Sequence, residues 1–155
     1  MNARLASAAL AVSLMVALAA PAVAVKRGQA KFVGGTIKTI VQDAEGPIDL
    51  THEKRLTFIP KDSANLVIPW DRVSQLEYGQ KVDRRKKTLL VSKSRKHYVT
   101  ITYQDKDKLE QAVVLEFDHE DIRMVLASLK ARTLQTIVFQ DEEARKEMGG
   151  VVEKK

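Results

Sequence analysis

Hydrophobic and polar residues alternate with a period of two along much of the chain, which predicts short strands separated by turns. The clearest example lies over 98–103, where Val99, Ile101 and Tyr103 share one side. Further strands are predicted over 31–41, 48–51, 55–59, 66–68, 70–78, 111–117 and 137–139. Segments rich in Asp, Gly, Pro, Ser or Lys separate them, at 43–47, 60–63 and 104–108. The pattern therefore predicts a mainly β protein.

Two strands are expected to be irregular. The Gly34–Gly35 pair suggests a bulge or a sharp bend in the first strand. In the strand over 70–78, Val73, Leu76 and Tyr78 share a face only if a bulge lies near 74–75. We expect Trp70 and Tyr78 to lie in or near the core, because aromatic residues are few and a core of this size needs them.

The spacing changes to a helical period after residue 118. Asp118 is a candidate N-cap, and Asp121 lies where it could close an arrangement like a capping box. An apolar stripe then follows at i, i+3, i+4 and i+7, formed by Ile122, Val125, Leu126 and Leu129. Residues 141–155 are charged and contain the Gly149–Gly150 pair near their end, and they are predicted to form a disordered tail.

About seven antiparallel strands closed by one C-terminal α-helix resemble the pleckstrin-homology-like superfold, including the bacterial PH-like and GRAM-type domains. The resemblance is carried by LVIPWDRVSQLEYG, SKSRKHYVTITY and VVLEFDHEDIRMVLASLKART, and it covers residues 30–140. It implies a bent β-sandwich or partly open barrel capped by the helix, with peptide binding at a sheet edge or beside the helix. A small β-barrel of the lipocalin type is the structural alternative.

The first 24 residues are typical of a secretory signal peptide. Arg4 supplies a positive charge, residues 5–20 are uncharged, and Ala22-Val23-Ala24 forms a cleavage site of small residues. We therefore expect export to the periplasm or the medium, with a short linker over 25–29. An uncleaved membrane anchor is the alternative, because about twenty apolar residues can span a bilayer.

Composition narrows the classes of protein further. The chain has no cysteine, which excludes disulfides and the acylated cysteine of a lipoprotein, so stability must come from a hydrophobic core. Its length suits one domain. Cleavage after Ala24 lowers the formal net charge from +6 to +5, a weaker charge than that of a dedicated nucleic-acid binder.

No catalytic motif, metal-ligand spacing or phosphate-binding loop is recognisable in the sequence. His52, His97 and His119 are far apart along the chain, and no nucleophile motif is present. The acidic residues at 118, 120 and 121 are explained by their place at a helix start. The sequence therefore predicts a protein that is not an enzyme and that has no cofactor.

One stretch is a candidate binding surface. Residues 81–97 hold eight Lys or Arg and one His against a single acid, Asp83. The candidate residues are Lys81, Arg84, Arg85, Lys86, Lys87, Lys93, Arg95, Lys96, His97 and Tyr98, the last as an exposed aromatic residue. His97 is expected at the start of the strand.

Three interpretations of this stretch remain open: a solvated turn without a ligand, a surface for a protein partner, and a surface for anionic lipid headgroups or envelope polyanions. Nucleic acid is not expected, because stacking aromatic residues are few and export separates the protein from it. The hypothesis from sequence is an exported binding or scaffold module that contacts a protein.

Overall fold

The computed structural model describes the backbone of residues 28–85 and 92–152, and the side chains of residues 28–80 and 95–150. In chain order the elements are β1 (Gly28–Gly35), β2 (Glu45–Asp49), β3 (Arg55–Phe58), β4 (Leu66–Pro69), the 3-10 turn η1 (Trp70–Arg72), β5 (Val73–Arg85), β6 (Ser92–Gln104), β7 (Glu110–Phe117), α1 (His119–Thr133), β8 (Ile137–Phe139) and α2 (Glu142–Val152). Among these residues, no helix is long and apolar enough to cross a bilayer. The segment predicted to be a signal peptide lies outside them.

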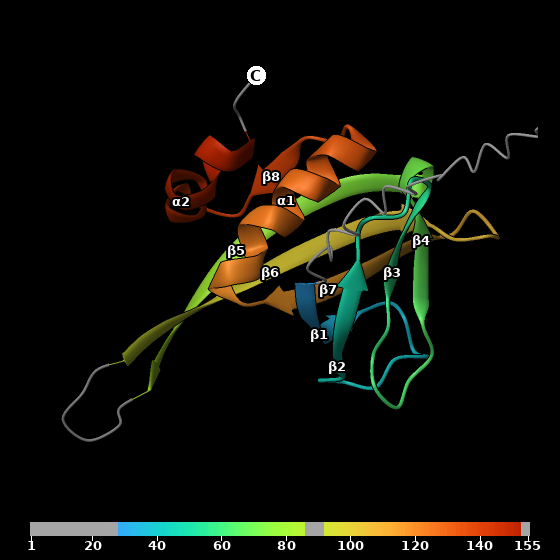
Figure 1. Cartoon of the computed structure of the whole chain (residues 1–155), viewed down its shortest axis with the longest axis horizontal. Coiled ribbons are helices and arrows are strands. Elements are labelled where there is room, and N and C mark those ends of the chain that lie inside the picture. Colours follow the sequence, from blue (N-terminus) through green and yellow to red (C-terminus); the bar gives the residue numbers. More distant parts are fainter. Residues whose placement is uncertain (1–27, 86–91, 153–155) are drawn as a thin grey trace, which may run out of the picture.

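The strands form one open sheet in the order β4-β3-β2-β1-β7-β6-β5-β8 (Figure 1). All neighbours are antiparallel except β5 and β8, which pair in parallel over three residues. The expectation of a mainly β fold with a helix after the strands is confirmed. About seven strands and one helix were expected. The described part of the chain has eight strands and two helices, and its sheet is open.

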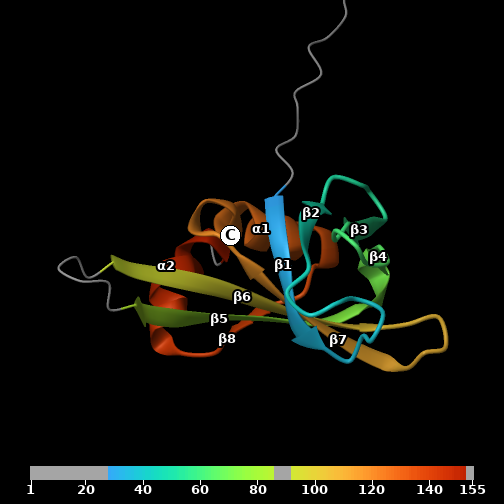
Figure 2. The same ribbon diagram turned by 90° about the horizontal axis from the view of Figure 1, so that it is seen from below.

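Pairing between β1 and β7 joins two parts of the sheet, β1–β4 and β5–β8, which run in different directions in Figures 1 and 2. The pairing register shifts between Phe32 and Gly34, next to the expected bulge, so that one extra residue is accommodated. A second shift lies between Val73 and Gln75, as predicted, and brings Val73, Leu76 and Tyr78 into the core.

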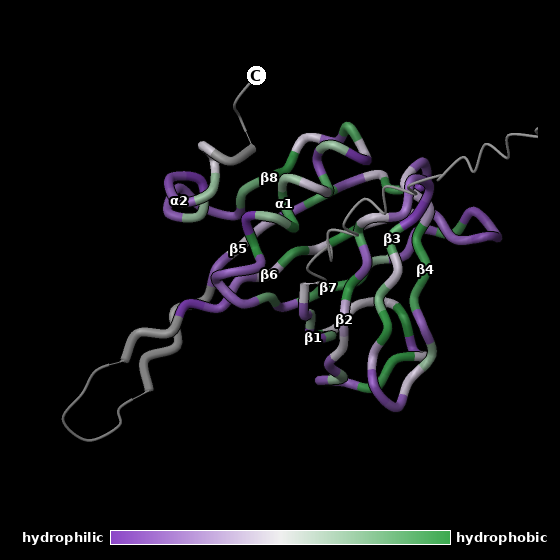
Figure 3. The backbone as a smooth tube through the Cα atoms, viewed as in Figure 1, coloured by the Kyte–Doolittle hydropathy of each residue, from purple (hydrophilic) through white to green (hydrophobic). Residues whose placement is uncertain are grey.

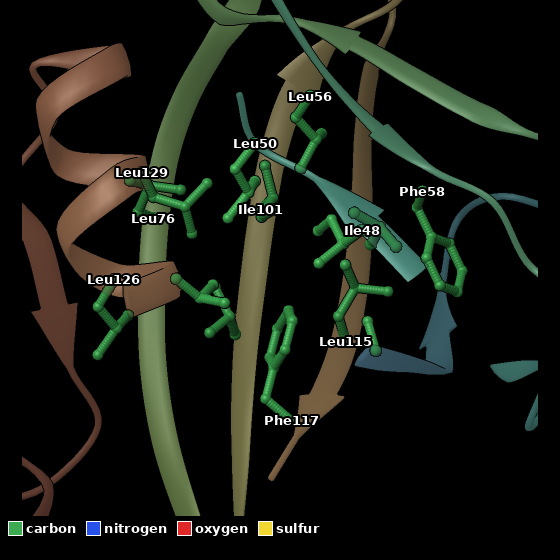
Figure 4. Close-up of a cluster of buried hydrophobic side chains, with 14 of the residues drawn as sticks. Ile48, Leu50, Leu56, Phe58, Leu76, Ile101, Leu115, Phe117, Leu126 and Leu129 are labelled. Atoms are coloured by element: carbon green, nitrogen blue, oxygen red, sulfur yellow. The ribbon is translucent and has the colours of Figure 1, made fainter. Parts of the chain in front are cut away.

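One hydrophobic core lies where both parts of the sheet and α1 meet (Figure 4). Leu56 and Phe58 reach it from β3, while Ile101 and Leu115 reach it from β6 and β7. Trp70 and Tyr78 are also buried, as predicted, and the indole N–H of Trp70 donates a hydrogen bond to the carbonyl of His52. Burial of this apolar surface is the main source of stability in a chain without disulfides.

Helix α1 covers this core with its predicted apolar stripe, and Ile122, Val125, Leu126 and Leu129 are fully buried. Its N-terminus differs from the expectation. Asp118 is the N-cap residue, yet its side chain makes no capping hydrogen bond. The carboxylate of Asp121 accepts a hydrogen bond from the backbone N–H of Gln29 at 3.0 Å, a contact to β1 that the sequence did not indicate. Asp121 therefore ties the start of the helix to β1.

The predicted disordered tail was wrong over residues 142–152, where the structure has helix α2. This helix is mainly hydrophilic (Figure 3), although Ala144, Met148 and Val151 recur at helical spacing in the sequence. It contacts α1, β5 and β8, and it buries Ala144 and Met148.

Several strand boundaries also differ. The first strand, β1, ends at Gly35 and not at residue 41, and β2 begins at Glu45, inside the predicted turn. The central strand β5 continues past residue 78 to Arg85, and β6 begins at Ser92, six residues before the predicted strand.

Candidate functional site

The paired strands β5 and β6 extend beyond the other strands as a two-stranded ribbon (Figures 1 and 2). Within the described backbone, β7 pairs with β6 from His97 onward, and β8 pairs with β5 from Leu76 to Tyr78. We define the β5–β6 ribbon as residues 80–85 and 92–96. No described strand pairs with either outer edge of this ribbon.

The ribbon contains most of the basic residues predicted to form a binding surface. Lys81, Arg84 and Arg85 lie in β5, and Lys93, Arg95 and Lys96 lie in β6. Lys86 and Lys87 lie outside the described residues. The basic stretch is therefore largely strand, where the sequence suggested a connection between strands.

The register opposes like charges across the ribbon. Lys81 is the pairing partner of Lys96, and Arg84 is the partner of Lys93. The ribbon's sequence therefore brings basic residues together on paired positions of the backbone.

Two of these basic residues already have acidic partners. Lys96 Nζ donates to Glu116 Oε1 at 2.8 Å, and Arg95 donates to Glu147 Oε2. Tyr98 lies on the same side of β6 as Lys96 and is half-buried. Because Lys96 and Arg95 are both paired with carboxylates, they are not the free charges that the interpretation from sequence assumed.

His97 differs from its expected place. It lies within β6, five residues after the strand begins, and its side chain is fully buried. The structure brings it to His119, the first residue of α1, with 3.2 Å between His97 Nε2 and His119 Nδ1. Glu147 of α2 follows, its Oε1 lying 3.6 Å from His119 Nδ1.

These three residues and their two neighbours form a continuous polar chain, which we call the histidine cluster: Tyr78, His97, His119, Glu147 and Arg95. At its inner end the Tyr78 hydroxyl lies 2.7 Å from His97 Nδ1. At its outer end Arg95 holds the carboxylate of Glu147. The cluster thus runs from the core beneath β5 to the surface at the base of the ribbon.

Four separate elements hold the cluster. Tyr78 comes from β5, Arg95 and His97 from β6, His119 from the start of α1, and Glu147 from α2. The ring of Phe139 meets that of Tyr78 edge-on, with centroids 6.0 Å apart, and so fixes the inner end. Helix α2 brings Glu147 to the cluster because Ala144 and Met148, on either side of it, are buried.

Burial controls the charge states at the inner end. Burial lowers the pKa of His97, an effect that the carboxylate of Glu147 opposes and the proximity of Arg95 reinforces. Burial also raises the pKa of Tyr78. A neutral imidazole next to a neutral phenol is therefore the expected state at pH 7.

Exposure differs among the three central residues: His97 is fully buried, the side chain of Glu147 is 16% exposed, and that of His119 is 61% exposed. One ligand atom from each of these three residues lies within 4.8 Å of the other two. Two imidazoles and a carboxylate at this separation, with His119 open to solvent, can share a metal ion or exchange protons.

Sequence reasoning missed this cluster, although one signal was available. The antiparallel strands β6 and β7 pair His97 with Phe117, so His119 lies only two residues beyond its pairing partner. The two predicted strands around the 104–108 loop imply that proximity. Glu147 had no comparable signal, because its segment was predicted to be disordered.

Comparison with known proteins finds no similarity for this chain: no family model, no curated protein and no solved structure matches it.

Proposed function

We propose that this chain is a non-enzymatic binding module that engages a protein partner along the β5–β6 ribbon. The main support is that both outer edges of the ribbon lack a pairing strand within the described backbone. Unpaired edges present rows of backbone N–H and C=O groups, to which an extended segment of another protein can add as a strand.

Charge supports the same proposal and specifies the partner. The backbone register places basic residues opposite each other, Lys81 opposite Lys96 and Arg84 opposite Lys93. An acidic strand laid along either edge is attracted by the net positive charge of the stretch. The proposed partner is therefore an extended, acidic protein segment.

The order of elements supports the resemblance to pleckstrin-homology-like domains. Seven of the strands follow the order β4-β3-β2-β1-β7-β6-β5, and α1 comes directly after β7. On this proposal the sheet is a bent sandwich with α1 across its open end. Export through a signal peptide over 1–24 belongs to the proposal, and it places the partner outside the cytoplasm.

Site-specific photocrosslinking in the producing cells tests the ribbon edge. A photoreactive amino acid at Ser94, where β6 pairs with β5 but no described strand pairs with its outer edge, is expected to form an adduct with a different protein. The same amino acid at Lys106, in the exposed loop between β6 and β7, is the matched control and is expected to form none. Adducts at both positions, or an adduct containing only a second copy of this chain, would contradict the proposal.

Anionic lipid headgroups or envelope polyanions form the alternative ligand class, which the density of basic residues over 81–96 favours. Each Lys or Arg near an anionic membrane contributes about 1 kcal/mol. On this alternative the protein sediments with anionic vesicles at low salt and is released as salt rises. Replacing Arg84, Arg85, Lys86 and Lys87 with Ser abolishes that sedimentation, while the thermal midpoint of unfolding stays unchanged. Equal sedimentation with neutral vesicles would exclude the alternative.

A further inference from the structure

The three potential ligand residues of the histidine cluster are held by the backbone framework and not by a loop. His97 lies in a strand that is paired on both sides, because β5 and β7 both pair with it. His119 begins α1, and Glu147 lies in the middle of α2. Sites built on strands and helices keep their side chains in more precise positions than sites on loops.

The separations match those of ligands around a single small metal ion. With Zn–N and Zn–O bonds of about 2.0–2.1 Å, two ligand atoms of a tetrahedral site lie about 3.3–3.4 Å apart. The nitrogen atoms of His97 and His119 are 3.2 Å apart, and the closest approach of His119 to Glu147 is 3.6 Å. The donor atoms therefore need to move only by tenths of an ångström on these two sides of the triangle.

The surroundings orient each ligand atom toward the shared point. His97 has Nδ1 against the Tyr78 hydroxyl, which leaves Nε2 as the nitrogen that faces His119. Arg95 occupies Oε2 of Glu147, so that Oε1 is the oxygen that faces His119. Partners of this kind, which fix the ring and the carboxylate from behind, are typical of metal sites.

We propose that His97 Nε2, His119 Nδ1 and Glu147 Oε1 bind one divalent transition-metal ion of the Zn²⁺ class. Two imidazoles and one carboxylate suit this class. Three protein ligands leave a further position for water, because His119 opens to solvent. The site is separate from the ribbon edge, so this inference does not rest on the proposed protein partner.

The proton arrangement needed for binding leaves one proton on each ring. In the metal-bound state the neutral His97 carries its proton on Nδ1 and donates it to the Tyr78 oxygen. Neutral His119 carries its proton on Nε2. Both facing nitrogens then present lone pairs, and the hydrogen bond between the two rings is replaced by two bonds to the metal.

Metal binding to the purified full chain, produced without a histidine tag, tests the site. Titration with ZnCl₂ followed by calorimetry is expected to show one ion bound per chain. His119→Ala is the first variant, because this mainly exposed side chain can be removed without opening the core. It is expected to weaken Zn²⁺ binding at least tenfold. Loss of a residue that only supports a metal ligand already lowers metal affinity by about tenfold or more. Glu147→Gln keeps the shape of the side chain and is expected to weaken binding in the same direction.

His52→Ala is the matched control, since His52 is the one remaining histidine of the chain and lies on an exposed loop. Its Zn²⁺ affinity is expected to equal that of the unmodified chain. CoCl₂ provides a second readout, because a site with histidine and carboxylate ligands in low coordination gives visible absorption bands that His119→Ala removes. Absence of one-to-one binding would overturn the proposal, as would equal weakening by His52→Ala and His119→Ala. In either case the cluster is a hydrogen-bond network only.

Discussion

At the scale of single residues, His97 is a titratable side chain buried in the core. It is a fully buried imidazole whose hydrogen-bonding nitrogens both have partners, Tyr78 on one side and His119 on the other. A buried polar group without such partners costs about 1–3 kcal/mol of stability. The position therefore tolerates a histidine because of its neighbours, although alternation along β6 marks it as a core position.

The buried His97 predicts that the protein loses stability in mild acid. Its pKa in the folded state is lowered by burial, whereas in the unfolded chain it is about 6.5. Below that pH the unfolded state binds more protons than the folded state, so the free energy of unfolding decreases as pH falls from about 6.5. Chemical denaturation between pH 7.5 and pH 5 measures this slope.

The variant His97→Gln separates this contribution from those of other groups. Glutamine cannot be protonated, so the variant is expected to be less stable at pH 7.5 but to lose less stability on acidification. His52→Gln, on an exposed loop, is expected to keep the pH dependence of the unmodified chain. An unchanged slope in His97→Gln would show that another group is responsible.

At the scale of elements, helix α2 shows how a mainly hydrophilic segment becomes ordered (Figure 3). Few of its side chains are apolar, yet Ala144 and Met148 are one helical turn apart and both are fully buried. The ion pair between Glu147 and Arg95 adds a contact to β6. A short helix of this composition is marginal alone, so its order depends on this docking.

Met148→Ala is expected to reduce the free energy of unfolding by about 2–5 kcal/mol, because it removes a fully buried side chain and leaves a cavity. The control Lys146→Ala changes an exposed position of the same helix and is expected to alter stability by no more than about 0.5 kcal/mol. Thermal and denaturant unfolding measure both. Equal stability of the two variants would mean that α2 does not pack on the body of the protein in solution.

At the scale of the whole molecule, the junction between β1 and β7 joins the two parts of the sheet. Gly35 closes this junction with φ of 140°, a conformation that L side chains rarely adopt. A Cβ atom placed there would lie 2.1 Å from the carbonyl oxygen of Ala112 in β7. The neighbouring Gly34 has open space around its Cα.

Gly35→Ala is therefore expected to destabilise the protein by about 1–3 kcal/mol through backbone strain, with a further cost from the contact with β7. Because one core is shared by both parts of the sheet, unfolding is expected to remain a single transition. Gly34→Ala is the control and is expected to leave the fold intact. Two separate transitions in Gly35→Ala would indicate that the two parts of the sheet fold independently.

Local patterning was sufficient for much of the architecture. Alternation located the strands that bury Leu56 and Ile101, the helical period located the stripe of α1, and a broken alternation located the bulge near Ser74. These features are determined by sequence alone because each depends on side chains a few residues apart facing the same solvent or the same core.

The remaining features were decided by contacts between distant residues. Pairing with β5 continued β6 back through the basic stretch to Ser92, and docking ordered α2, although both segments are rich in charged residues. The histidine cluster depends on both events, since β6 supplies His97 and α2 supplies Glu147. Sequence determined which residue types were present, but only tertiary structure brought three ligand atoms from three elements to one point. Positions separated by tens of residues along a chain meet only where backbone pairing and core packing place them.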